Sequence, residues 1–146
     1  MISVVGLGNA ASSIAELFSS TPEYNVYRLA SKIKRGKNKK VLKDFRDPEE
    51  YEKNVPNLKN FFKDIDDEVQ FFIVGSSMSS NYALGVLEQI KNKNINLFYI
   101  KPDTELLAGI PRLVERAAYG VLQEYARSGL FKSMTIISNE NIEKIL

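Results

Sequence analysis

Two short segments of the sequence carry the residue types that bind phosphate groups. The segment Gly6–Ala11, GLGNAA, follows a β-branched run, and the segment Gly75–Asn81, GSSMSSN, follows the apolar run Phe71–Val74. Each segment leads into a stretch whose apolar residues have helical spacing. Glycine lets backbone N–H groups approach a ligand, a helix N-terminus attracts anions, and serine adds hydroxyl donors. We therefore predict two phosphate-binding turns that act through backbone amides.

The sequence lacks the side chains that most often carry out acid–base and nucleophilic catalysis. Its 146 residues include no histidine and no cysteine. Such a chain has neither the commonest general base nor a thiolate nucleophile, and it forms no disulfide. Serine–histidine and cysteine–histidine catalysis within this chain are excluded. The net charge of +2 says little about partners.

Each of these features also has a plain structural explanation. Glycine pairs are common at tight turns from a strand into a helix, and serines before a helix often only cap it. The segment 32–43 holds seven lysines and arginines and no acid, which is typical of a solvated loop. No aromatic residue is interleaved there for base stacking, so nucleic-acid binding by this basic loop is the less favoured interpretation. The two turns favour a ligand only if they share one edge of a sheet.

The elements that must position these turns alternate between strands and helices. Apolar runs predict strands over residues 2–5, 25–30, 69–74, 96–100 and 133–138. Helical spacing and first-turn prolines predict helices over residues 12–19, from 48, over 58–65, 80–92 and 111–128, and the start of one at 139–146. This order predicts one α/β domain over residues 1–146, with a doubly wound, mostly parallel, Rossmann-like sheet and helices on both faces. No apolar run approaches the roughly 18 residues of a membrane span, and no secretory signal is visible, so we expect a cytoplasmic protein.

One candidate ligand is a dinucleotide. The pattern Gly6-x-Gly8-x-x-Ala11 fits the dinucleotide-binding fingerprint, which is completed by an acid at the end of the second strand. Here that strand ends in Ser31 and Lys32, with no acid, although these two residues could hold the 2′-phosphate of NADP. The Walker A pattern is absent. An NADP-binding domain therefore remains an alternative.

Taken in order along the chain, the motifs resemble the N-terminal nucleotide-binding domain of the tubulin/FtsZ superfamily. Val4–Ser13 is similar to that family's first glycine-rich loop, and Gly75–Asn81 falls on its signature loop, with serines in place of most glycines. Asp47–Glu49 is similar to the third loop, near the γ-phosphate. Tyr99–Pro102 resembles the strand that leads to the ribose loop, and Ile137–Glu140 resembles the end of the strand before the long central helix.

The resemblance implies a site for GTP or GDP with Mg²⁺. It places the backbone amides of Gly8–Ala11 at the α/β-phosphates and the segment Gly75–Ser80 around the β/γ-phosphates, while Ser13 and Asn139 face the base. It assigns no catalytic residue and no metal ligand within this chain. The residues expected to bind nucleotide, which include an acid and an arginine for the ribose, are Gly6, Gly8, Asn9, Ala10, Ala11, Ser13, Gly75, Ser76, Ser77, Met78, Ser79, Ser80, Pro102, Glu105, Arg112 and Asn139.

The resemblance also implies a partner and a place of action. The family forms cytoskeletal filaments by self-association and hydrolyses GTP where an acidic loop of one subunit meets the nucleotide of the next. This sequence ends where the family's central helix begins, so we expect either a domain of a longer protein or a natural truncation, and no GTPase activity from this chain alone. The serine-for-glycine changes leave a further alternative open, a protein-interaction module that kept the fold and lost the site.

Overall fold

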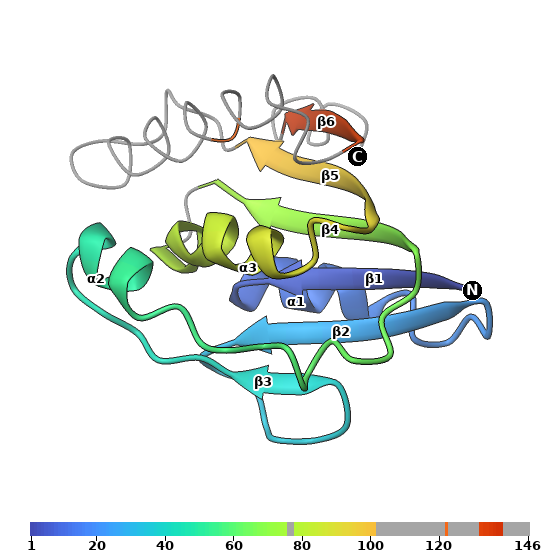
Figure 1. Cartoon of the computed structure of the whole chain (residues 1–146), viewed down its shortest axis with the longest axis horizontal. Helices are drawn as coiled ribbons and strands as arrows, with labels where there is room; N and C mark the ends of the chain where they lie inside the picture. The colour runs from blue at the N-terminus through green and yellow to red at the C-terminus, as the bar shows by residue number, and fades with distance from the viewer. Residues whose placement is uncertain (76–77, 102–121, 123–131, 139–146) are drawn as a thin grey trace.

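The computed structural model describes residues 1–75, 78–101, 122 and 132–138, and Figure 1 traces the chain. Its elements in chain order are β1 (Ile2–Leu7), α1 (Asn9–Glu16), β2 (Tyr24–Ala30), β3 (Lys39–Val41), α2 (Pro48–Lys53), β4 (Glu68–Val74), the 3-10 helix η1 (Met78–Tyr82), α3 (Ala83–Gln89), β5 (Asn94–Lys101) and β6 (Ser133–Ser138).

The six strands in the described residues belong to one parallel sheet, which confirms the predicted α/β fold class. The strand order is β3-β2-β1-β4-β5-β6, and every neighbouring pair is parallel. The chain therefore builds outward from β1 to β3, returns to the middle of the sheet, and builds outward again from β4 to β6 (Figure 1). Doubly wound sheets bind their ligands where this direction reverses, beyond the carboxyl ends of the strands. Here the reversal lies between β1 and β4.

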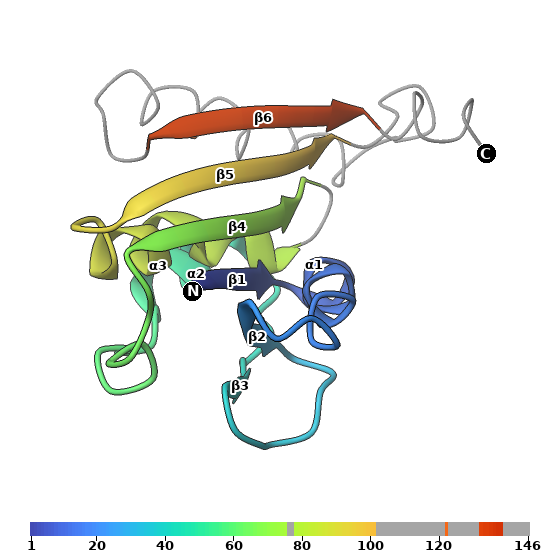
Figure 2. The same ribbon diagram turned by 90° about the vertical axis from the view of Figure 1, so that its right-hand side faces the viewer.

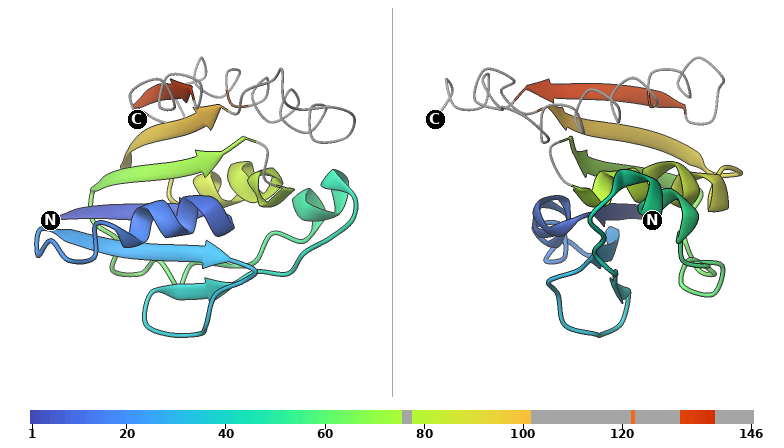
Figure 3. Two further views of the ribbon diagram at one scale, coloured as in Figure 1. Left: turned by 180° about the vertical axis from the view of Figure 1, so that it is seen from behind. Right: turned by 90° about the vertical axis from the view of Figure 1, so that its left-hand side faces the viewer.

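Helices cover both faces of the sheet, as Figures 2 and 3 show. Because side chains alternate along a strand, Val4 and Val5 point to opposite faces and both are fully buried. Val4 packs in a cluster with Ala11 and Ala15 of α1, and Val5 belongs to a larger cluster that includes Val86 of α3. This double burial explains why the central strands are continuously apolar.

The basic segment 32–43 contains a strand that the sequence did not predict. Lys39–Val41 forms β3, which pairs in parallel with Arg28–Ala30 at the edge of the sheet. A turn leads into it, closed by the Lys39 N–H donating to the Gly36 carbonyl over 3.1 Å. Lysine is a poor strand former, and a strand this short gives almost no periodic signal. Its pairing is set by the free edge of β2.

The predicted helix over residues 58–65 is wrong, because the structure has turns there. Leu58, Phe62 and Ile65 are buried, as their spacing predicted. The Phe62 N–H donates to the Leu58 carbonyl over 2.9 Å, but the Ile65 N–H closes a shorter turn to Phe62 over 3.1 Å. At the start of the segment, the Leu58 N–H donates to the Gln89 side chain of α3 over 2.6 Å. A tertiary contact thus anchors the segment without a continuous helix.

The predicted helix boundaries also shift. The first helix begins directly after Gly8, and the predicted helix 80–92 is divided into η1 and the shorter α3. The predicted helices over 111–128 and 139–146 lie outside the described residues, apart from Leu122, which is helical and buried. No helix in the described part of the chain is both long enough and apolar enough to cross a membrane.

Candidate functional site

The two predicted phosphate-binding turns leave neighbouring strands at the same edge of the sheet. β1 and β4 are paired in parallel, with Leu7 opposite Ile73, so both carboxyl ends meet at the reversal of strand order. After β1 the chain continues into α1 on one face, and η1 and α3 lie on the other face (Figure 2). The first condition for a shared ligand site at this edge is therefore met.

Gly8 forms the sharp turn from β1 into α1. Its backbone has φ 100° and ψ 164°, a conformation that is essentially restricted to glycine. The Gly8 N–H donates to the Leu29 carbonyl of β2 over 2.7 Å, so the turn is also fixed to the neighbouring strand. A side chain at this position would strain the turn, and the glycine is explained by backbone geometry.

Gly6 is required for a different reason. A Cβ atom at this position would lie 2.7 Å from the Ala11 carbonyl carbon and 2.8 Å from the Ser12 Cα. The first turn of α1 therefore packs directly on the backbone of β1, which no other residue at position 6 permits. Gly6 supports the site by packing and does not itself face the open end of the helix.

The N-terminus of α1 presents N–H groups without acceptors. The first intrahelical bond is the one from the Ser12 N–H to the Gly8 carbonyl, at 2.8 Å. Within the described part of the chain, no residue accepts a hydrogen bond from the N–H of Asn9, Ala10 or Ala11. The first turn contains no acid, and no side chain caps it. Such a helix end carries a partial positive charge and suits an anionic group.

The Asn9 side chain joins this turn to the end of β2. Its Nδ2 donates to the Ser31 hydroxyl over 3.2 Å, and its Oδ1 accepts from the Lys32 N–H over 2.9 Å. Ser13, expected to face the base, instead donates from its exposed hydroxyl to the Asn9 carbonyl over 3.1 Å. In dinucleotide-binding folds the end of the second strand holds the ribose. Here Asn9 engages both residues that an NADP site would use.

Gly75 is explained by packing against Tyr99 of β5. The Gly75 N–H donates to the Ile100 carbonyl over 3.0 Å, so β4 and β5 stay bonded as far as this residue. A Cβ at position 75 would lie 2.6 Å from Cζ of the buried Tyr99 ring. Gly75 does not have the positive φ of Gly8. Its N–H already donates within the sheet, so this glycine offers less to a phosphate than the sequence suggested.

Ser79 and Ser80 of the serine-rich segment do not cap α3. Residues 78–82 form η1, and the N-cap of α3 is Tyr82, in helical conformation with no side-chain cap. Ser79 and Ser80 are only 4% and 3% exposed, and Met78 packs beside the core. The 3-10 turn continues directly into α3 and thereby replaces the free helix end that a cap would mark. The free helix end at Asn9–Ala11 therefore suits an anion better than the start of α3 does.

The predicted third loop lies at the same edge of the sheet. α2 begins at Pro48 after the N-cap Asp47, as the sequence predicted, and Figure 1 shows it beyond the carboxyl ends of the strands. Tyr51 of α2 packs edge-to-face on Tyr82 of η1, with ring centroids 4.8 Å apart. The Tyr82 hydroxyl donates to the Lys43 carbonyl over 2.6 Å, and burial raises the pKa of Tyr82, which keeps this donor protonated. These tyrosines hold the acidic first turn of α2 beside η1.

Several predicted site residues cannot be placed by the structure. Lying outside the described residues are Ser76, Ser77, Pro102, Glu105, Arg112 and Asn139. In the described part of the chain, no three acidic side chains gather as a metal site. Sequence reasoning assigned no role at this edge to Tyr51 and Tyr82, which pack on each other between α2 and η1.

The chain matches no protein-family model, and no curated protein is significantly similar to it. The resemblance of its motifs to the tubulin/FtsZ superfamily therefore remains a hypothesis. Function has to be argued from the geometry at the carboxyl edge of the sheet.

Proposed function

We propose that this chain is a guanine-nucleotide-binding domain of tubulin/FtsZ type, which takes GTP or GDP with Mg²⁺ at the carboxyl edge of its sheet. One observation carries the proposal. Gly8, in a conformation restricted to glycine, turns the chain at the start of α1, beside the reversal of strand order. Three N–H groups stand at this helix end, and no described residue accepts a hydrogen bond from them. Backbone N–H groups at a helix N-terminus bind phosphate in this way and need no basic side chain.

The residues around this helix end fit a phosphate chain. The first turn of α1 holds no carboxylate that would repel one. The adjacent strand β4 ends at the same edge, and η1, which follows it in the chain, would supply the second wall. Asp47 and Glu49 of the α2 turn lie at the same edge, where they would meet a phosphate through a hydrated Mg²⁺. Mg²⁺ would supply charge neutralisation, and the chain's own backbone amides would orient the phosphates.

NADP is the alternative ligand, because the strand order and the pattern Gly6-x-Gly8-x-x-Ala11 are also those of dinucleotide-binding domains. The Asn9 side chain argues against it. Its amide forms hydrogen bonds with the Ser31 hydroxyl and the Lys32 N–H. A 2′-phosphate at the end of β2 would have to compete for these two groups. Self-association into filaments follows only from the family resemblance and is part of the same proposal.

Thermal unfolding in a matched ligand panel tests the proposal. GTP, GDP, ATP and NADP are each added at 1 mM with Mg²⁺, and we expect GTP and GDP to raise the melting temperature most. A dissociation constant of about 100 µM would add about 1.4 kcal/mol at this concentration. A larger shift with NADP would replace the guanine-nucleotide assignment, and no shift with any nucleotide would favour the interaction module.

A substitution at Ala10 locates the site. Ala10 is exposed in the first turn of α1, so Ala10→Glu places a carboxylate where the phosphate would lie. The negative charge favours the helix itself, so the unliganded protein should be at least as stable as the wild type. We expect the variant to lose the GTP shift and the neutral Ala10→Gln control to retain it. An unchanged shift in Ala10→Glu would place the nucleotide elsewhere.

A further inference from the structure

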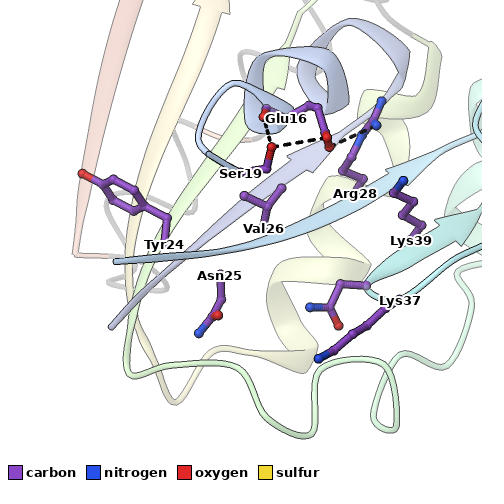
Figure 4. Close-up of a pocket in the computed structure, with 9 residues that line it drawn as sticks. Glu16, Ser19, Tyr24, Asn25, Val26, Arg28, Lys37 and Lys39 are labelled. Carbon is purple, nitrogen blue, oxygen red and sulfur yellow. Dashed lines mark hydrogen bonds and ion pairs between the residues drawn. The ribbon is translucent and has the colours of Figure 1, made fainter. Parts of the chain in front are cut away.

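A second feature of the molecule, away from the carboxyl edge, is a pocket of about 240 Å³ beside the outer edge of β2. β3 pairs only with Arg28–Ala30, so the first four residues of β2, Tyr24–Tyr27, have no neighbouring strand on that side. Lys37 and Asn38, in the chain that leads into β3, also line the pocket. Figure 4 shows how Lys37 and the β2 residues lie around it. The pocket thus occupies the place where β3 would continue if it were longer.

Backbone groups face this space. The Leu29 carbonyl accepts from Gly8 on the β1 side, whereas the Arg28 N–H donates to the Asn38 carbonyl over 2.8 Å on the β3 side. Because backbone groups alternate in direction along a strand, the N–H and C=O of Val26 point the same way as those of Arg28. No described residue forms a hydrogen bond with either group of Val26. An unpaired strand edge of this kind is a template for another strand.

The side chains show that the pocket follows the strand edge. Val26 and Arg28 project to the α1 face and Asn25 to the opposite face, yet all three line the same pocket (Figure 4). The Tyr24 ring, also at the pocket, is engaged edge-to-face by Phe18, with centroids 5.2 Å apart. A ligand in this pocket would therefore meet the backbone groups of β2, because the Tyr24 ring is already packed on Phe18.

The charge around this edge is positive. Arg28 forms an ion pair with Glu16 over 3.2 Å, and its Nε donates to the Ser12 hydroxyl over 2.9 Å. Lys37 and Lys39 line the same pocket, and neither has an acidic partner in the part of the chain that the structure describes. The pocket is lined by one acidic residue, Glu16, and by three basic residues, Arg28, Lys37 and Lys39, so its net charge is positive. This charge favours an acidic partner.

We propose that the outer edge of β2 binds an extended acidic peptide segment, which adds as a short strand beside Val26. The Val26 N–H and C=O would supply the backbone hydrogen bonds, and Lys37 and Lys39 would pair with carboxylates of the peptide. Four residues of β2 span about 13 Å, so the added strand is short and the binding salt-dependent. This mode of recognition needs no nucleotide and is independent of the proposed function.

A labelled acidic peptide tests the proposal directly. The probe is the capped hexapeptide Glu-Val-Glu-Val-Glu-Val, followed by fluorescence anisotropy at low salt. Two matched probes are the same peptide with alternate backbone nitrogens methylated, which cannot complete a strand ladder, and a single-stranded oligothymidine. We expect the acidic peptide to bind at least tenfold more tightly than either.

Two variants locate the peptide on the protein. Val26→Pro removes an N–H that faces outward, so the pairing of β2 with β1 is kept while the added strand loses its donor. Lys37→Glu with Lys39→Glu reverses the charge at the edge. We expect each to weaken peptide binding at least tenfold. The control, Lys59→Glu with Lys63→Glu, makes the same change of charge at two exposed positions beside another pocket and should leave binding within twofold.

Four outcomes would overturn the proposal. Equal binding of the N-methylated peptide would show attraction by charge without a strand. Tighter binding of the oligothymidine would assign the edge to nucleic acid. Full binding by a folded Val26→Pro variant, with an unchanged circular dichroism spectrum, would place the peptide elsewhere. If the acidic peptide does not bind at all, the lysines only protect the edge from unwanted pairing.

Discussion

At the scale of single residues, the three glycines near the candidate site are required for three different structural reasons. Gly8 is fixed by its backbone conformation, Gly6 by the backbone of α1 and Gly75 by the Tyr99 ring. Only Gly8 shapes the helix end that would meet a phosphate. The three substitutions therefore should not behave alike.

Gly8→Ala should destabilise the protein by about 1–3 kcal/mol, because a Cβ atom is strained at φ 100° and ψ 164°. Gly36→Ala is the matched control. Its Cβ would meet only the flexible Lys39 side chain, at 3.3 Å, and Gly36 has no positive φ. It should change stability by less than about 1 kcal/mol. Urea unfolding measures both, and equal losses would contradict the role given to Gly8.

Gly75 and Tyr99 should be energetically coupled. Gly75→Ala forces its Cβ against the Tyr99 ring and should cost about 1–3 kcal/mol through overpacking. When Tyr99 is replaced by valine, the space opens, and adding Gly75→Ala should then cost much less. A double-mutant cycle from denaturant unfolding measures the difference. Additive losses would show that Tyr99 is not the reason for the glycine.

At the scale of elements, three strands are joined at the edge opposite the candidate site. The Asp66 carboxylate, just before β4, accepts hydrogen bonds from the Ser3 hydroxyl of β1 and the Asn25 amide of β2, each at 2.8 Å. The Asp66 N–H also donates to the fully buried Ser3 hydroxyl over 3.0 Å. These contacts fix the start of β4 beside β1, and so fix the register of the two strands whose far ends form the site.

This junction should make stability depend on acid. Partial burial, the largest single influence, raises the pKa of Asp66. Hydrogen bonds from Asn25 and Ser3, the charge of the N-terminus and a backbone hydrogen bond together outweigh it and hold the pKa below its ordinary value. A lowered pKa adds stability above the unfolded pKa of about 3.9, and this stability is lost as the pH falls through the folded value. Asp66→Asn should therefore flatten the acid limb of the stability profile.

Ser3→Ala checks the same junction from the other side. Losing a hydrogen bond to a charged group should cost about 1.5–3 kcal/mol at pH 7, and clearly less once Asp66 is protonated. Ser13→Ala, on the exposed face of α1, is the control and should change stability by less than about 0.5 kcal/mol. Unfolding is measured at pH 7 and at a series of lower pH values, until the acid loss of stability in the wild type is complete. A Ser3→Ala loss that stays the same across the whole series would rule out the carboxylate as its cause.

At the scale of the whole molecule, the proposed nucleotide site has N–H groups that could donate hydrogen bonds to phosphate. It has few side chains that could catalyse hydrolysis. Hydrolysis needs a group that positions water at the γ-phosphate, and this sequence offers no histidine or cysteine. The α2 turn presents Asp47 and Glu49 at this edge. Carboxylates beside a triphosphate repel it unless Mg²⁺ intervenes, so they fit a role in metal binding better than one in activating water.

We therefore expect GTP turnover by this chain to stay at the uncatalysed background. Phosphate release is measured over a wide range of protein concentration, with Mg²⁺ present. Turnover that is independent of protein concentration and is lost on Asp47→Ala would show that a complete active site lies within these residues. That result would overturn the comparison with a family in which two subunits share the catalytic site.

The sequence by itself determined the features that depend on local patterns. Continuous apolar runs such as Phe71–Val74 specify strands buried on both faces, and helical spacing between them specifies the crossovers of a parallel sheet. The turn at Gly8 and the helix start at Pro48 could be predicted because glycine and proline restrict the backbone at their own positions. The α/β class and the tight turn from β1 into α1 follow from these local constraints.

The tertiary structure alone decided the features that depend on partners distant in sequence. β3 exists because Arg28 offers a free edge to Asn38 and Lys39, and the segment 58–65 is held as turns by Gln89. Met78–Tyr82 form a 3-10 turn that runs into α3, and the Asn9 side chain donates a hydrogen bond to Ser31 at the end of β2. Local propensity carries no record of such contacts, because their energy arises only when the sheet brings the partners together.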